Sequence, residues 1–137
     1  MVRFRMFKIS VGQFAILSQE VPQGGINMSS KMDLKHAADG GAIQVGASFV
    51  FENGEEKIMV LDVFCEFVIH RDDLKTLTKD GKVIIPKDTI DYFIAQTVGA
   101  SRGILHCKTE GTPFNGIVLP PMNVTGFFKD DMVINLQ

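Results

Sequence analysis

The sequence has few cysteines, little net charge and no long apolar run. Its 137 residues include two cysteines, Cys65 and Cys107, which are too few for a disulfide scaffold. We therefore expect buried thiols in a reducing, cytoplasmic compartment. The longest apolar stretch, residues 58–69, is interrupted by Asp62 and Glu66, and the N-terminal residues have no apolar segment behind them. The sequence therefore predicts neither an export signal nor a membrane span.

Charge and motifs argue against several other classes of protein. The formal net charge is -2 and the basic residues are scattered, so there is no electrostatic reason to expect a nucleic-acid partner. The sequence contains no glycine-rich phosphate loop ending in lysine, so ATP-driven work is not indicated. No internal repeat or low-complexity tract divides the chain, and we expect residues 1–137 to form a single domain.

The candidate catalytic and metal-binding residues lack the context that their chemistry needs. Residues 99–103 match the G-x-S-x-G pattern of a hydrolase, but that motif needs a sharp turn after a strand, whereas here it falls within a predicted helix. The downstream His106 is not preceded by a carboxylate after Ser101. Cys65 and His70, five apart on a predicted strand, point to opposite faces, and the histidines and cysteines lack zinc spacing. We expect no catalytic residue, no metal and no cofactor.

One amphipathic helix dominates the second half of the sequence. Apolar or small residues recur at helical spacing from Ile90 to Leu105, which predicts four turns with one buried face. Asp88 is the expected N-cap, Pro86 lies just outside the helix, and Gly111 follows its far end. No other long element is available to cover the sheet that precedes it.

The first half of the sequence predicts an antiparallel sheet. Apolar residues fall at positions 7, 9 and 11 and then at Phe14 and Ile16, a change of parity that indicates a β-bulge near Gly12. A loop rich in proline and glycine follows and continues into Ile26 and Met28, which is more apolar than a solvated loop usually is.

Three further strands follow this loop. Strands are predicted at residues 28–34, 43–51 and 58–69, and Asn53-Gly54 predicts a tight hairpin between the last two. The last strand is apolar on both faces, yet the helix can cover only one side of the sheet. The second face is buried within the fold or forms an intermolecular surface.

The sequence predicts the conformation of only part of the C-terminal segment, residues 123–137. Asn123 or Thr125 can cap a short helix that includes Val124, Phe127 and Phe128. The conformation of residues 132–137 is left undecided by their pattern.

These motifs, taken in order, resemble those of SecB, the bacterial protein-export chaperone. The helical half carries Ile-Pro at 85–86, a helix ending in Val-Gly-Ala-Ser-Arg-Gly at 98–103, Leu-Pro-Pro-Met-Asn-Val at 119–124 and Phe-Phe at 127–128. The sheet half carries Lys-Met-Asp-Leu at 31–34, and Gly-Glu-Glu at 54–56 with Asp62. The resemblance spans residues 14–128. The chain departs from the family by an insertion at residues 106–115 and by lacking an extended polar C-terminal tail.

The resemblance implies an α+β fold, in which a four-stranded antiparallel sheet is packed by one long helix and a short C-terminal helix. It implies a homotetramer built as a dimer of dimers. It also implies an ATP-independent chaperone that holds non-native polypeptides in an apolar groove, for export. The alternative is a SecB-like chaperone dedicated to one partner, such as a toxin-antitoxin pair, and a small-ligand module or enzyme is a third interpretation.

The resemblance also assigns candidate site residues. Those of the polypeptide groove are Phe14, Ile16, Leu17, Ile26, Met28, Val124, Phe127 and Phe128. An acidic patch of the family docks the export ATPase SecA; Glu20 and Asp62 match it only partly, so we expect weak affinity at most. Seven methionines and eleven phenylalanines can supply the adaptable apolar surface that such a groove needs, although most of them must serve the core.

Overall fold

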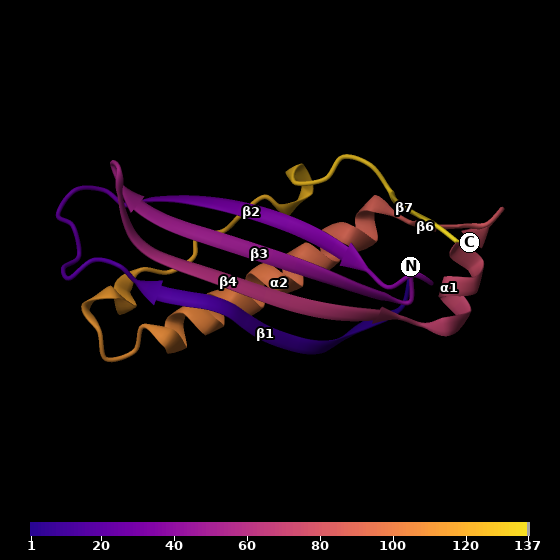
Figure 1. Cartoon of the computed structure of the whole chain (residues 1–137), viewed down its shortest axis with the longest axis horizontal. Helices are drawn as coiled ribbons and strands as arrows, with labels where there is room; N and C mark the ends of the chain where they lie inside the picture. The colour runs from indigo at the N-terminus through magenta and orange to yellow at the C-terminus, as the bar shows by residue number, and fades with distance from the viewer. Residues whose placement is uncertain (137) are drawn as a thin grey trace.

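The computed structural model describes residues 1–136, in which a long antiparallel sheet is crossed by one long helix (Figure 1). The four-stranded sheet has the order β1-β4-β3-β2, and a second sheet of three short strands has the order β5-β6-β7. In chain order the elements are β1 (Phe4–Ile16), β2 (Asn27–His36), β3 (Ala42–Asn53), β4 (Glu56–Ile69), α1 (Arg71–Leu77), β5 (Thr78–Lys79), β6 (Lys82–Ile85), α2 (Lys87–Lys108), η1 (Pro113–Gly116), η2 (Val124–Gly126) and β7 (Met132–Asn135).

The core lies between α2 and the face of the large sheet that it crosses, which we call the inner face. Alternate residues of the central strands β3 and β4 point inward and are buried, as the period of two in the sequence predicts. They are Ile43, Val45, Ala47, Phe49 and Phe51 on β3, and Met59, Leu61, Val63, Cys65, Phe67 and Ile69 on β4. The predicted hairpin is present, but Asn53 pairs with Glu56, so the loop is Gly54-Glu55. Gly54 has a φ of 62°, which suits glycine at the first loop position.

The predicted bulge in β1 is confirmed. The register with β4 shifts between Val11 and Gln13, and it shifts again between Met6 and Lys8. A Cβ atom on Gly12 would overlap the ring of Phe64, so any larger residue would force the ring or the strand to move. Because one residue is left out of the pairing, apolar side chains on both sides of the bulge face inward.

The long helix α2 matches the prediction closely, but its N-terminus differs. Pro86 occupies the N-cap position and no side chain caps the helix, so the predicted Asp88 cap is wrong. The backbone N–H of Lys87 instead donates to Oδ1 of Asp131 at 2.8 Å. The helix thus gains its cap from a segment that lies far along the chain.

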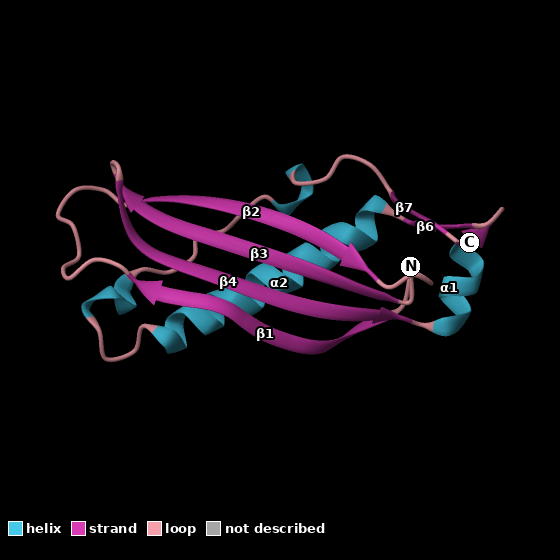
Figure 2. Ribbon diagram, in the orientation of Figure 1, coloured by secondary structure: helices cyan, strands magenta, loops and turns pink. Residues whose placement is uncertain are grey.

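Residues 71–85 form structure that was not predicted from the sequence, and residues 132–135 form a strand where the pattern left the conformation undecided. They contain α1 and the small sheet, which lie together at one end of the molecule (Figure 2). The predicted short C-terminal helix is a single 3-10 turn, η2, and it is followed by the strand β7, which pairs antiparallel with β6. Asn123 does cap the turn, because its Oδ1 accepts from the backbone N–H of Thr125 at 3.1 Å.

The two cysteines differ in environment. Cys65 is buried against α2, and burial raises the pKa of its thiol. Cys107 is exposed near the end of α2, so the prediction of two buried thiols holds only for Cys65. Within residues 1–136, none of the helices has the length and apolar character needed to cross a bilayer.

Candidate functional site

The structure divides the predicted groove residues between two parts of the molecule. On the inner face, Ile16 pairs with Met59, which pairs with Phe51, which pairs with Met28, so one apolar row crosses all four strands. Phe14 lies beside this row on β1, and Ile26 precedes Met28. Leu17 follows β1, and 53% of its surface is exposed. These five predicted residues gather at the end of the sheet that carries the β3-β4 hairpin.

The other three predicted residues lie away from that hairpin, near the N-terminal half of α2. Val124 belongs to η2, and Figure 1 shows this turn beside the N-terminal half of α2. Phe127 and Phe128 are both half-buried and pack against the core, so neither is fully turned inward or outward.

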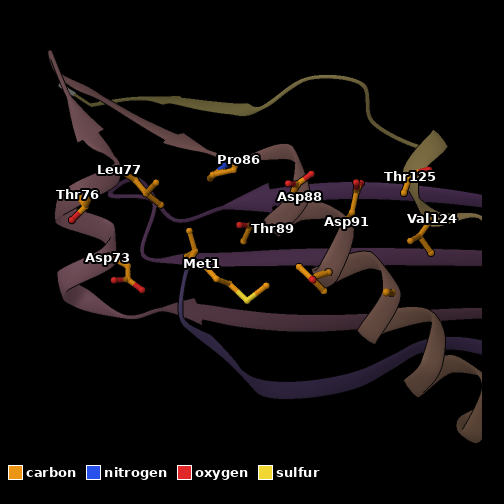
Figure 3. Close-up of a pocket in the computed structure, with 13 residues that line it drawn as sticks. Met1, Asp73, Thr76, Leu77, Pro86, Asp88, Thr89, Asp91, Val124 and Thr125 are labelled. Atoms are coloured by element: carbon orange, nitrogen blue, oxygen red, sulfur yellow. The ribbon is translucent and has the colours of Figure 1, made fainter.

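A cavity of about 760 Å³ opens where the N-terminus, α1, α2 and η2 meet (Figure 3). Its apolar wall is formed by side chains from all four segments. They are Met1, Val2, Leu77, Tyr92, Ala95 and Val124. A cavity of this size falls in the range of pockets that hold a ligand or several side chains of a peptide. Of the predicted site residues, only Val124 lines it.

One wall of the cavity is fixed by an ion pair between the N-terminal segment and α1. The guanidinium of Arg3 donates to both carboxylate oxygens of Asp73, at 3.1 Å from Nε and 3.0 Å from Nη2. The backbone N–H of Arg3 also donates to Asp73, at 2.6 Å. These hydrogen bonds lower the pKa of Asp73 to about 2, so its carboxylate is ionised at neutral pH.

The facing wall is fixed by Lys87 at the start of α2. Its Nζ donates to Oδ2 of Asp91 at 2.8 Å and to the backbone carbonyl of Thr125 at 3.1 Å. This lysine therefore ties the helix to η2 at the point where both line the cavity. The other oxygen of Asp91 is shielded from solvent and has no hydrogen-bond partner within residues 1–136.

This cavity was not predicted from the sequence, because α1 was not predicted. A signal was present: His70 is the N-cap of α1 and Asp72 and Asp73 occupy its first turn, which is the charge pattern of a helix N-terminus. The helix has seven residues and none is buried, so it shows no apolar periodicity to reveal it.

Comparison with known proteins gives one informative similarity. No protein-family profile and no curated protein sequence matches the chain. Among solved structures, it is similar to the SecB-like chaperone Rv1957 of Mycobacterium tuberculosis, which was solved with a ChAD peptide from the HigA1 antitoxin. That match has a TM-score of 0.59 and 10% identity over 88% of each chain. The chain has a SecB-like fold. A Streptococcus agalactiae protein of unknown function also matches, with a TM-score of 0.44 and 9% identity over 88% of this chain and 99% of that one.

Asp62 and Glu20, the two acidic residues predicted to match the SecA-docking patch in part, lie in different parts of the structure. Asp62 lies on the outer face of the sheet, where its Oδ1 accepts from the hydroxyl of Ser48 at 2.6 Å. Glu20 lies in the loop between β1 and β2, beside a shallow hollow that Leu17 and Glu56 also line.

The hydrolase-like motif of this chain, residues 99–103, lies inside α2, as the sequence predicts. Ser101 is fully buried, and its hydroxyl donates to the carbonyl of Thr97 at 2.7 Å. In this position the hydroxyl cannot reach a substrate. The part of the chain that the structure describes contains no group of three or more His, Cys, Asp or Glu side chains arranged to hold a metal ion.

Proposed function

We propose that this protein is an ATP-independent chaperone that binds extended, non-native polypeptide and serves a dedicated partner. The observation that carries the proposal is the SecB-like fold, shared with a chaperone that was solved with a peptide from an antitoxin. That neighbour favours a dedicated partner over a general role in export, and it supports a binding protein more than an enzyme.

Exposed apolar surface on the inner face supports polypeptide binding. Ile9 pairs with Cys65 and Val11 with Val63, so both face the helix side of the sheet. Yet Ile9 is 52% exposed and Val11 is 38% exposed, because α2 does not cover the β1 edge. Together with the nearby exposed Leu17, these side chains offer apolar area to an extended chain.

The expected energetics need no nucleotide. Burying about 1,000 Å² of apolar surface is worth roughly 25 kcal/mol before the cost of ordering the bound chain, and that cost removes much of it. A protein that binds the unfolded state and not the native one shifts the folding equilibrium by mass action alone. We expect net affinities between micromolar and nanomolar.

The proposal includes a homotetramer and the groove predicted from sequence. Its residues Phe14, Ile16, Ile26 and Met28 lie at one end of the inner face, and an extended polypeptide is long enough to continue to Val124, Phe127 and Phe128. Weak affinity for the export ATPase SecA is expected, since Glu20 and Asp62 match the docking patch only in part.

Client breadth is the property that tests this function. Polypeptides captured from cells would be identified by mass spectrometry, resynthesised as overlapping peptides and measured by calorimetry. Suppression of aggregation would be measured in parallel with two unrelated unfolded proteins. A dedicated chaperone should bind one captured polypeptide at least about a hundredfold more tightly than the others. Equal affinity for many clients would instead indicate a general chaperone, and a chain that neither binds peptides nor suppresses aggregation would overturn both interpretations.

A further inference from the structure

The cavity between the N-terminus, α1, α2 and η2 has the features of a binding site, and no predicted residue except Val124 belongs to it. Its walls are held by Arg3 with Asp73 on one side and by Lys87 with Asp91 on the other. A wall fixed by charged hydrogen bonds does not need to be ordered when a ligand enters, which lowers the cost of binding.

One carboxylate at the cavity has no ion-pair partner. Asp73, Asp88 and Asp91 line the cavity, and Met1, which carries the N-terminal amino group, lines it as well. Asp73 and Asp91 already have the basic partners described above, whereas Asp88 has no ion-pair partner within residues 1–136. The cavity therefore presents an apolar interior with a negative charge at its rim, next to the exposed ring of Tyr92.

We propose that this cavity anchors the partner polypeptide by one large apolar side chain, with a lysine or arginine beside it at Asp88 and Tyr92. The inference rests on the proposed function and adds a second anchor, separate from the row of Ile16 and Met28. A basic side chain fits here because it pairs with the uncompensated carboxylate and can lie over the tyrosine ring. An acidic neighbour would instead be repelled by Asp88.

Two labelled peptides test the charge preference. Both have a Gly-Ser frame and a central Leu-Phe pair, followed in one by two arginines and in the other by two glutamates. Fluorescence anisotropy should show that the arginine peptide binds about tenfold more tightly at low salt, and that the difference shrinks as salt is added. Asp88→Lys should reduce this preference to near unity and Asp88→Asn should reduce it in part, whereas Glu110→Lys, past the far end of α2, should leave it unchanged.

A steric variant tests the cavity itself. Ala95 lines the cavity and is exposed, so Ala95→Trp fills space without disturbing the core. It should weaken binding of the arginine peptide about tenfold, because the apolar side chain loses its pocket. Gln96→Trp adds the same ring at the next exposed position, which does not line the cavity, and should leave affinity unchanged. Thermal melting of each variant would show that folding is intact.

The outcomes separate this inference from the proposed function. If the wild-type protein suppresses aggregation but prefers neither peptide, or if Ala95→Trp binds as the wild type does, the anchor is wrong and the chaperone function stands. If Ala95→Trp changes the oligomeric state without peptide, the cavity holds a second copy of the chain and the inference is overturned. If the wild-type protein neither binds peptide nor suppresses aggregation, the proposed function fails as well.

Discussion

At the scale of single residues, Gly12 shows how one side chain sets the shape of a strand. A Cβ atom there would overlap the Phe64 ring, so Gly12→Ala forces the ring or the strand to move. We expect Gly12→Ala to lower the free energy of unfolding by about 1–3 kcal/mol, as other overpacked sites do. Urea denaturation measures the loss. Gly25→Ala is the matched control because a Cβ atom there meets no neighbour, and equal losses in the two variants would contradict this explanation.

The pair of Arg3 and Asp73 gives a pH dependence with a definite sign. Hydrogen bonds from Arg3 lower the pKa of Asp73 from 3.8 to about 2. A carboxylate whose pKa is lower in the folded state stabilises the fold above its unfolded pKa and loses that contribution as the pH falls. The melting temperature of Asp73→Asn should therefore be lower than that of the wild type at neutral pH. The difference should narrow below pH 3.8 and close near pH 2.

A difference that persists at pH 2 would show that Asp73 acts by some means other than its charge. Glu110→Gln provides the control, since it removes an exposed carboxylate that has no ion pair within residues 1–136. Its melting temperature should follow that of the wild type across the same pH range.

At the scale of elements, a helix or strand was predicted where its apolar residues recur at a regular spacing. Elements without such a spacing were not predicted. β3, β4 and α2 were predicted because each has many buried apolar residues at one spacing. The seven residues of α1 include none that is buried, and β5 has two residues, so neither shows a pattern.

The C-terminal strand could not be predicted for a different reason. Met132–Asn135 is too short to distinguish a strand from a helix, and its conformation depends on pairing with β6, some fifty residues earlier in the chain. Two of the predicted groove residues, Ile16 and Met28, also depend on such pairing, because the row that joins them exists only once four strands are in register. Local sequence indicates which face each residue takes and where a tight hairpin turns, but it does not say which distant strand β1 will pair with.

The role of β7 can be tested through its buried and exposed faces. Ile134 is 1% exposed, whereas the neighbouring Val133 is 50% exposed. Ile134→Ala should destabilise the protein by about 2–5 kcal/mol, since it leaves a cavity against Val83. Val133→Ala should change stability by no more than about 0.5 kcal/mol. Chemical denaturation of both variants measures this, and similar values would show that β7 does not stabilise the fold.

At the scale of the whole molecule, the β1 edge is the feature that most favours assembly. β1 is a long edge strand, and Phe7, Ile9 and Val11 are exposed along it. Exposed apolar edge strands pair with other chains unless they are protected. We expect a homotetramer, which native mass spectrometry at micromolar concentration would detect, and Phe7→Lys, which leaves Ile9 and Val11 in place for a polypeptide, should shift it toward smaller species. A wild-type protein that is only monomeric would remove the argument. Ile84→Lys, on the small sheet, should leave the assembly unchanged.

The strand order also has a consequence for the time course of folding. His36 pairs with Ile43 and Asn53 with Glu56. Short loops therefore join β2 to β3 and β3 to β4, and these strands can pair early in folding. Phe4, by contrast, pairs with Ile69, and this closure costs more chain entropy. We therefore expect β1 to dock last although the ribosome releases it first. Until it docks, the apolar edge of β4 stays open to other chains, and a newly made molecule exposes the same kind of strand edge that a chaperone recognises in its clients.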